Sequence, residues 1–418
     1  MKLTNGHNDL KHTIDTVKRG IMMLPFSLKE YKKRLDQTKK SMLERGIEVL
    51  IVTNPANMNY LSGYNSWSFY VDQMLIVIVD EDQPIWIGRK MDANAAKATT
   101  WLYHENIIPY PEDYVHSKIK HPSEFAAQIL TQIGQSKSRI GLEMDSYYFS
   151  AQSYECLKRN LPNAIFSDAS LLVNYVRIVK SDQEIEFIKR AAKIVEIGMQ
   201  TAVNSIQEGV RECDAVANIY GDLIRGTSEF GGDYPAIVPM LPAGENTSTP
   251  HITWTDKKYT NNQMVIIEIA GCYQRYHSPL ARTVSLGKPS QEAMDVSKIV
   301  VEGLNAALEA VKPGATCEEL EIAWSKVISK HGIVKDSRIG YSMGLNYPPD
   351  WGEHTASIRR GDLTVLQPNM TFHLIPGLWF DNYGIEISES FRVTETGCEV
   401  LTNFPRQLFV NESHNLQV

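Results

Sequence analysis

The chain has 418 residues, of which 43% are hydrophobic and 22% are charged, and its formal net charge is −7. This length exceeds what one ordinary hydrophobic core holds, so we expect two domains. The acidic balance leaves no basic surface for a nucleic acid, and no apolar run is long enough to cross a bilayer. The widely spaced cysteines form no Cys-x-x-Cys pair, which indicates reduced thiols in a cytoplasmic protein.

Residues 1–24 are expected to form an N-terminal extension. Their sequence is too polar and too mixed in charge for a signal peptide. We expect this extension either to be loosely held or to pack on a partner subunit.

Strand and helix patterns alternate from residue 25 to residue 178, which predicts an α/β domain. Apolar runs predict strands over residues 48–53, 74–80, 84–88 and 139–143. The helical spacing of apolar residues predicts helices over residues 27–45, 91–99, 122–133 and 150–160.

A second domain is expected over residues 179–418. Ser181, followed three residues later by Glu184, forms a capping box, which predicts the start of a long helix over residues 182–205. Further helices are expected over residues 212–225, 291–311 and 317–330, and late strands over residues 371–374 and 386–393.

Residues 265–283 predict two strands joined by a short turn, with a single carboxylate, Glu268, inside an apolar first strand. Burying an unpaired carboxylate costs on the order of several kcal/mol. Glu268 is therefore expected to be paired, protonated or used in chemistry.

This hairpin resembles the metal-binding hairpin of the pita-bread family, which includes methionine and Xaa-Pro aminopeptidases and creatinase. The resemblance implies a fold of the α/β (α+β) class. A creatinase-type α/β domain over residues 25–178 would precede a pita-bread catalytic domain over residues 179–418. The second domain would have a curved, mainly antiparallel sheet covered by helices.

The metal ligands of the family are mostly absent here. Of the matching positions only Glu268 keeps its donor, whereas the others hold Pro279, Tyr341, Ile375 and Ser388. A site for two divalent ions needs several carboxylates and an imidazole, so the comparison predicts no metal and no other cofactor. Shifting the last match by one residue would recover Glu389, but the donors would remain too few.

Residues 243–251 match a family turn that ends in Pro-His, which places His251 at a site position. The resemblance implies that this histidine faces the substrate, as in the aminopeptidases, and serves acid–base chemistry, as in metal-free creatinase. An imidazole titrates near neutral pH, as a proton-shuttling group requires. The alternative is an ordinary surface or core histidine, which the matching turn makes less favoured.

Among metal-free members, the ectoine hydrolases show the strongest resemblance, from about residue 25 to residue 410. The matching segments are residues 63–71, 141–150, 231–239, 268–277 and 347–353. These enzymes open the ring of ectoine, a cyclic amidine, to N-acetyl-2,4-diaminobutyrate; 5-hydroxyectoine is a related candidate substrate. The resemblance implies that Glu268 attacks the ring carbon and that His251 protonates the departing nitrogen and later activates water. In a variant, Glu268 acts as a general base or by its charge, and water attacks directly.

Other side chains are candidates for substrate binding. Asp233 and Tyr234 lie in a Gly-Gly-Asp-Tyr-Pro loop whose glycines permit close approach to a ligand, and an anionic side chain suits a cationic amidinium. His277 and His373 are either hydrogen-bonded strand histidines or site residues. Tyr341 is expected to donate a hydrogen bond into the former metal pocket.

Three further candidates lie outside the matched ligand positions. Glu386 is either an ordinary polar strand residue or part of the substrate pocket, because its strand leads from the former metal site. Trp67 and Tyr70 belong to an aromatic run that is more often core than ligand site. In this family, however, the N-terminal domain of one subunit can cover its partner's site, where aromatic rings would suit a flat cation. The resemblance therefore implies a homodimer.

Other functions are weighed against ectoine hydrolysis. A creatinase-like amidinohydrolase acting on a guanidino substrate is the mildest alternative. The ligand count argues against a metal-dependent Xaa-Pro aminopeptidase. The retention of Glu268, His251 and the loop around Asp233 argues against a non-catalytic, peptidase-like binding module.

Overall fold

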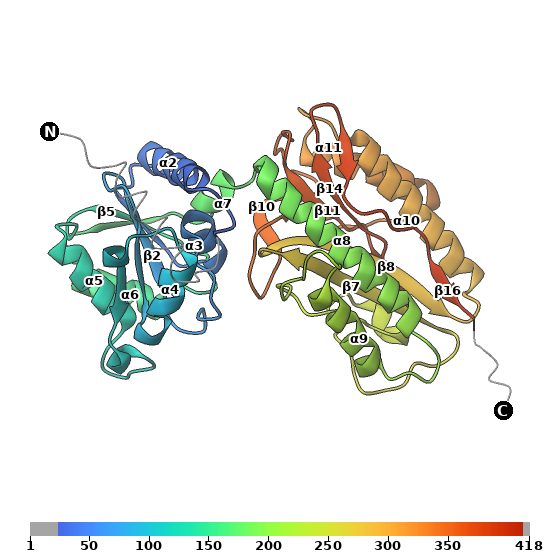
Figure 1. Ribbon diagram of the computed structural model, residues 1–418. Coiled ribbons are helices and arrows are strands. Elements are labelled where there is room, and N and C mark those ends of the chain that lie inside the picture. The colour runs from blue at the N-terminus through green and yellow to red at the C-terminus, as the bar shows by residue number, and fades with distance from the viewer. Residues whose placement is uncertain (1–23, 413–418) are drawn as a thin grey trace. The chain divides into compact units, whose positions relative to one another are not determined.

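The computed structural model describes residues 24–412 of the chain (Figure 1). These residues divide into two compact units, the first ending at Arg177 and the second beginning at Ile178. The expected extension over residues 1–24 lies outside the described residues, except for its last residue. None of the helices within residues 24–412 combines the length and the apolar character needed to cross a membrane.

The N-terminal unit contains a six-stranded mixed sheet in the order β4-β3-β2-β1-β5-β6. Its strands are β1 (Val49–Val52), β2 (Met74–Ile78), β3 (Ile85–Arg89), β4 (Ile107–Tyr110), β5 (Arg139–Leu142) and β6 (Ile165–Asp168). The strands β1, β2 and β3 pair antiparallel, and the remaining neighbours pair parallel. Its helices are α2 (Leu28–Glu44), α3 (Pro55–Ser62), α4 (Ala93–Thr99), α5 (Pro122–Gln132), α6 (Ala151–Asn160) and α7 (Leu172–Val176).

A buried carboxylate holds the central strand β1 to the helix that follows it. Glu143, directly after β5, accepts hydrogen bonds from the backbone N–H groups of Thr53 at 2.7 Å and Asn54 at 2.8 Å. It also accepts from Nδ2 of Asn57 at 2.6 Å. These donors at the start of α3 offset the cost of burying the charge.

The C-terminal unit contains a three-stranded sheet, a five-stranded antiparallel sheet and the helices that pack on them. Its helices are α8 (Asp182–Ser205), α9 (Glu212–Arg225), α10 (Gln291–Ala310) and α11 (Cys317–Ile328). Its first sheet has the order β16-β8-β7, with β7 (Gln263–Tyr273), β8 (Tyr276–Leu286) and β16 (Phe409–Asn411).

The second sheet of this unit has the order β10-β9-β11-β14-β15, and all of its neighbours pair antiparallel. Its strands are β9 (Gly340–Met343), β10 (Gly352–Ile358), β11 (Thr371–Leu374), β14 (Glu389–Val393) and β15 (Cys398–Val400). Between β11 and β14 in the sequence, β12 (Leu378–Trp379) and β13 (Gly384–Ile385) pair as a two-stranded antiparallel ladder. The 3₁₀ turn η4 (Gly244–Ser248) precedes β7.

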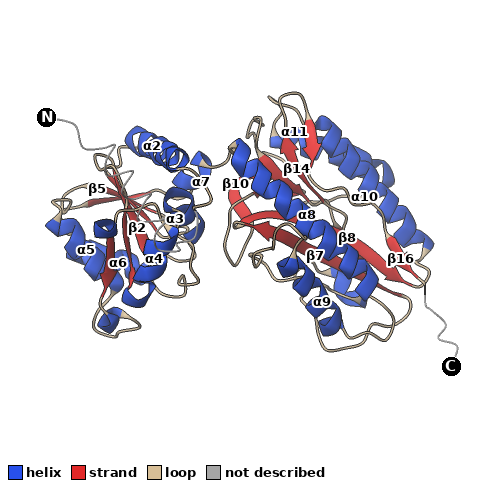
Figure 2. Ribbon diagram, viewed as in Figure 1, coloured by secondary structure: helices blue, strands red, loops and turns tan. Residues whose placement is uncertain are grey.

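Helices lie along the sheets of this unit (Figure 2). Two apolar cores join these helices to the sheets. Helices α8 and α9 pack on the β7–β8 hairpin, and α10 and α11 pack with the five-stranded sheet. The hairpin approaches α8 closely at Gly271, where a Cβ would lie 2.0 Å from the carbonyl oxygen of Ala191. Only glycine permits that approach, which fixes the depth of β7 under the helix.

The predicted fold class is confirmed, with an α/β unit followed by mainly antiparallel sheets covered by helices. The capping box of Ser181 and Glu184 is present at the start of α8. The predicted strand over residues 386–393 is wrong in its first part, because β14 begins only at Glu389.

The residues before β14 hydrogen-bond to β8 instead of continuing the ladder with β11. The backbone N–H of Glu386 donates to Oγ1 of Thr283 at 2.9 Å, and that of Ser388 donates to the carbonyl of Ala281 at 3.1 Å. This departure brings Glu386 and Ser388 against the hairpin that carries Glu268.

Candidate active site

Glu268 lies in the middle of β7, opposite Ala281 of β8, and is 5% exposed. Its backbone forms a two-way bridge with Met240, with both N–H···O distances at 3.0 Å. Within residues 24–412 its carboxylate forms no hydrogen bond and no ion pair. The sequence left three possibilities for the Glu268 carboxylate, namely that it is paired, protonated or used in chemistry. Since it has no partner within residues 24–412, protonation and a role in chemistry remain.

A second carboxylate, Glu386, is fully buried near Glu268. Neither of its carboxylate oxygens has a hydrogen-bond partner among the described residues. Burial raises the pKa of Glu268 well above its ordinary value, and the charges of Glu386 and Asp350 raise it further. Burial raises the pKa of Glu386 to about 8, against the opposing effect of the Lys335 ammonium. Because like charges at low dielectric oppose each other, the two carboxylates are not both ionised at neutral pH unless a cation lies beside them.

A hydrogen-bonded chain occupies the position of the former metal ligands. Nε1 of Trp351 donates to Oη of Tyr341 at 2.8 Å, and this hydroxyl lies 3.0 Å from Nδ1 of His373. Nε2 of His373 lies 2.8 Å from Oγ of Ser388, which also accepts from the backbone N–H of Ala281 at 2.7 Å. Burial lowers the pKa of His373 to about 3, so the chain is neutral.

Two arrangements of the protons are compatible with this chain. In the first, Nε2–H of His373 donates to Ser388 and Tyr341 donates to Nδ1, which leaves the hydroxyl hydrogen of Ser388 outside the chain. In the second, Ser388 donates to Nε2 and Nδ1–H donates to Tyr341, whose hydroxyl hydrogen is then available to a group outside the chain. Burial and the charge of Glu268 raise the pKa of Tyr341, so it keeps this hydrogen.

The residues at the family's ligand positions do not fit a pair of divalent cations. Tyr341 and Ser388 belong to the neutral chain, and among residues 24–412 no three His, Cys, Asp or Glu side chains gather as a metal site would require. The alternative ligand Glu389 is also engaged, with Arg282 at 2.7 Å and Arg406 at 3.1 Å. This buried ion pair stabilises the sheet and leaves Glu389 unsuited to a metal.

His277 is held on both ring nitrogens. The backbone N–H of Ala236 donates to Nε2 at 2.9 Å, and Nδ1 lies 3.3 Å from the carbonyl oxygen of Gly344. Burial, together with the charge of Arg275, lowers the pKa of His277 to about 3. The structure thus gives this histidine a positioning role between two loops, and its predicted contact with substrate stays a prediction.

Asp233 and Tyr234 hold the turn of the hairpin. Asp233 accepts from the backbone N–H of Arg275 at 3.0 Å, and its own N–H donates to the carbonyl of Cys272 at 2.8 Å. The Arg275 guanidinium lies 4.0 Å from the ring centroid of Tyr234 and donates to its carbonyl. The cysteine itself is buried, and burial raises the pKa of the Cys272 thiol to about 12, as suits an inert core residue.

His251 follows the η4 turn and is solvent-exposed. Its side chain forms no hydrogen bond or ion pair within the described part of the chain. The turn itself lies close to the site, because a Cβ on Gly384 would be 2.1 Å from the carbonyl oxygen of Thr247 and 2.7 Å from Cδ1 of Trp379. The acid–base role of His251 stays a prediction.

Trp67 and Tyr70 lie in the N-terminal unit, whereas Glu268 and its neighbours lie in the C-terminal unit. Trp67 is 56% exposed and packs on Phe69 at a centroid distance of 4.7 Å. Tyr70 is 57% exposed and accepts a hydrogen bond from Arg89 at 3.2 Å. Their expected contribution to a partner's site stays a prediction.

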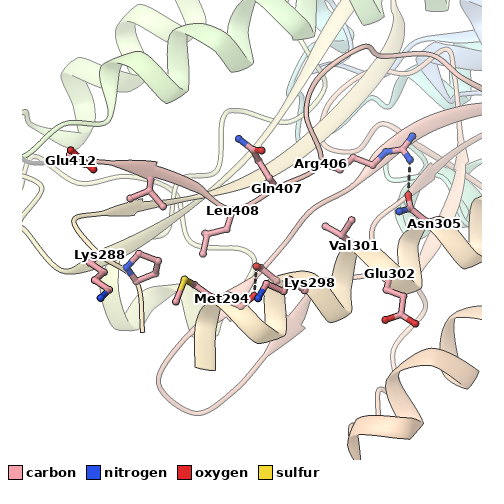
Figure 3. Close-up of a pocket in the computed structure, with 13 residues that line it drawn as sticks. Lys288, Met294, Lys298, Val301, Glu302, Asn305, Arg406, Gln407, Leu408 and Glu412 are labelled. Carbon is pink, nitrogen blue, oxygen red and sulfur yellow. Dashed lines mark hydrogen bonds between the residues drawn. The ribbon is translucent and has the colours of Figure 1, made fainter. Parts of the chain in front are cut away.

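A hollow of about 830 Å³ opens elsewhere on the C-terminal unit, between α10 and the segment leading into β16 (Figure 3). Arg406 donates to Asn305 across part of it at 2.7 Å. None of the predicted site residues lines this hollow. A second hollow of about 880 Å³ includes Lys335 and Arg338 among its lining residues.

Sequence reasoning missed Lys335, Trp351 and Trp379. Lys335 donates to the carbonyl of Gly377 at 2.7 Å and lies 4.3 Å from the ring centroid of Trp379. Burial lowers the pKa of Lys335 to about 8. A signal existed for Trp351, which lies in the segment over residues 347–353 that resembles ectoine hydrolases. Lys335 and Trp379 belong to no recognised motif.

Two family models match the chain. The model of metallopeptidase family M24 matches residues 186–395, and that of the creatinase/prolidase N-terminal domain matches residues 34–179. The chain is 46% identical over 395 residues to ectoine hydrolase of Halomonas elongata, covering 93% of this chain and 98% of that protein. It is 47% identical to the uncharacterized hydrolase/peptidase y4tM of Sinorhizobium fredii, covering 93% of this chain and 100% of that protein.

Solved structures show the same fold at low sequence identity. The recombinant prolidase from Thermococcus sibiricus superposes with a TM-score of 0.78 at 22% identity, covering 92% of this chain and 100% of the other. Dipeptidase PepE from Mycobacterium ulcerans superposes with a TM-score of 0.77 at 21% identity, covering 93% of this chain and 99% of the other. These likenesses confirm the expected pita-bread architecture.

The raised pKa of Glu386 predicts a pH dependence of stability. A carboxyl whose folded-state pKa is about 8, against an ordinary 4.5, binds more protons when folded, so its contribution to stability falls as the pH rises between these values. We expect Glu386→Gln, which cannot ionise, to gain melting temperature relative to the wild type as the pH rises from about 5 to about 7.5. Thermal denaturation across this range measures the difference.

The matched control is Glu399→Gln, since Glu399 is a half-buried carboxylate paired with Lys189 and Arg392. This control should not show the same rising difference. A difference between Glu386→Gln and the wild type that does not change with pH would contradict a raised pKa at Glu386.

Proposed function

The chain belongs to metallopeptidase family M24, and from this premise we propose that it hydrolyses ectoine, opening the cyclic amidine ring to N-acetyl-2,4-diaminobutyrate. The observation that carries the proposal is the pair of buried carboxylates, Glu268 and Glu386, with no cation from residues 24–412 paired with Glu268. Ectoine supplies such a cation as its amidinium. The relative named for this activity is similar over nearly the whole chain.

Glu268 is the proposed nucleophile. An amidinium beside it favours the ionised carboxylate and so offsets the effect of burial on its pKa. The carboxylate attacks the ring carbon between the two nitrogens, and one carbon–nitrogen bond of the ring breaks. Water then adds to the same carbon and displaces the carboxylate, which leaves the acetamide of the product. Dividing the reaction into two steps lowers the barrier of each.

The remaining proton transfers are assigned to groups at the edges of this site. His251 protonates the departing nitrogen and later takes a proton from water. In the tautomer in which Nδ1–H of His373 donates to Tyr341, Tyr341 offers its hydroxyl hydrogen to the oxygen or nitrogen that gains electron density during attack. The variant in which water attacks directly, with Glu268 as its base, uses the same residues.

The proposed reaction needs no metal ion. The donors at the family's ligand positions support this, because Tyr341 and Ser388 are neutral and Glu389 is paired with two arginines. All five cysteines are free thiols, which suits the reducing cytoplasm, where we propose the enzyme works.

A direct test compares three substrates. The purified protein is expected to release N-acetyl-2,4-diaminobutyrate from ectoine and to leave creatine and a Xaa-Pro dipeptide unchanged, as measured by chromatography of the products. Turnover should persist after exhaustive chelation, with elemental analysis as the control. Hydrolysis of creatine or the dipeptide in place of ectoine would reject the substrate. Stoichiometric metal whose removal abolishes turnover would reject the metal-free mechanism.

Substitutions separate the roles of the two catalytic candidates. Glu268→Gln keeps size and shape but removes the nucleophile, so turnover should be lost while substrate still binds weakly. His251→Ala should lower turnover by about 10²–10⁴-fold, the usual contribution of a general acid–base group. Mass spectrometry of acid-quenched enzyme should find an adduct on the peptide that contains Glu268. Near-normal turnover by Glu268→Gln would sink both roles proposed for it, whereas a missing adduct alone would favour direct attack by water.

We also propose a homodimer in which the N-terminal unit of one subunit closes the partner's site. The exposed rings of Trp67 and Tyr70 support such a surface. Sedimentation should show a dimer, and Trp67→Ala should lower kcat/KM about 10-fold through loss of an aromatic contact to the cationic ligand. Ile119→Ala, at a residue 89% exposed in the same unit, is the control. A fully active monomer at assay concentration would refute the arrangement.

A further inference from the structure

Three polar side chains around Gly377, namely Glu386, Lys335 and Trp379, have hydrogen-bonding groups that the described residues do not use. Both carboxylate oxygens of Glu386 and Nε1 of Trp379 are buried without a partner among residues 24–412. Lys335 donates only to the carbonyl of Gly377, although an ammonium carries three hydrogens. Buried polar groups without protein partners are uncommon in folded proteins, and bound water, an ion or a ligand satisfies such groups.

The three side chains converge on Gly377. A Cβ on Gly377 would lie 2.7 Å from two ring carbons of Trp379 and 3.2 Å from Cγ of Glu386. Nζ of Lys335 lies 2.7 Å from the carbonyl oxygen of the same glycine and 4.3 Å from the ring centroid of Trp379. Glu386 in turn is close enough to Glu268 for its charge to act on it.

The unused groups divide into acceptors and donors. Glu386 contributes carboxylate oxygens that accept hydrogen bonds, next to those of Glu268. Lys335 and Trp379 contribute N–H groups that donate. Lys335 and Glu386 do not form an ion pair with each other, since no such contact within 4.0 Å exists among the described residues. A single ligand that engages both sets carries N–H donors for Glu386 and an oxygen acceptor for Lys335 and Trp379, which suits a zwitterion.

We propose that Glu386, Lys335 and Trp379 form the subsite that binds both charged groups of a zwitterionic substrate. Glu386 accepts an N–H of the ring amidinium, while Lys335 and Trp379 donate to the carboxylate of the same molecule. This inference rests on the proposed function and extends it by naming the residues that select an amidine bearing a carboxylate.

The subsite also explains how the ring is held for attack. With one ring N–H on Glu386 and the carboxylate on Lys335 and Trp379, two points of the ring are fixed. Rotation of the ring relative to Glu268 is then restricted, which favours a productive orientation of the carbon between the nitrogens. Gly377 is required here, because any side chain would enter the space between Trp379 and Glu386.

The test crosses two variants with two ligands. The ligands are ectoine and its decarboxylated analogue, 2-methyl-1,4,5,6-tetrahydropyrimidine, which keeps the amidinium and lacks the carboxylate. Lys335→Met should raise KM for ectoine about 10–100-fold, the effect of losing a charged hydrogen bond, and change binding of the analogue by less than about twofold. Glu386→Gln should weaken both ligands alike. If the enzyme hydrolyses the analogue, its binding is measured by KM. If not, its binding is measured by its inhibition constant against ectoine hydrolysis.

Two further variants guard against indirect effects. Lys326→Met removes an exposed lysine from the hollow that also includes Lys335 and should change neither ligand. Trp379→Phe keeps an aromatic ring but removes the N–H, and should weaken ectoine more than the analogue. Equal losses for both ligands in Lys335→Met, with an unchanged melting temperature, would overturn the proposal.

Failure of the proposed function gives a different result. If the wild type does not hydrolyse ectoine, the same variants are compared by the thermal stabilisation that ectoine, creatine and the analogue produce. Stabilisation by the carboxylate-bearing ligands that is lost in Lys335→Met supports the subsite alone. No stabilisation of the wild type, or the same loss with all ligands, overturns the subsite as well.

Discussion

Two carboxyl groups, Glu268 and Glu386, lie buried near each other, and burial opposes the ionisation of both. Burial removes nearly all of their exposed surface, and no cation pairs with Glu268 within the described residues. Each raises the free energy of ionising the other. A cationic ligand relieves this cost, so the same feature that weakens the empty site favours binding of an amidinium. In the proposed site, this cost favours a cationic ligand over a neutral one of the same shape.

Two of the groups at the family's metal-ligand positions, Tyr341 and Ser388, belong with His373 to a neutral hydrogen-bonded network. Tyr341, His373 and Ser388 satisfy one another and the backbone, and burial keeps the imidazole uncharged. A charged group in this place would compete with the substrate for the carboxylates. The scaffold of a metallopeptidase family thus carries a site whose positive charge is proposed to come from the substrate.

Much of the remaining polar structure serves to keep the hairpin and its loops in place. Arg275, in the turn of the hairpin, lies between the rings of Tyr234 and Tyr347, at 4.0 Å and 4.6 Å. His277 joins the loop at Ala236 to that at Gly344. Such fixed loops lower the entropy lost when a ligand is bound. Several residues first considered for substrate contact thus have a demonstrated structural role.

The sequence by itself determined the class of the fold, the long capped helix α8, the hairpin and the unusual position of Glu268, because periodicity, capping and burial of a charge are local properties. It also indicated Glu386 as a candidate, without its relation to Glu268. Only the tertiary structure decided that Glu386 is turned toward β8, since its backbone bonds to Thr283 across more than a hundred residues. The same holds for Lys335 and Trp379, which meet at Gly377. Their unused hydrogen-bonding groups depend on packing between distant segments, and no local pattern in a sequence records which buried groups remain without partners.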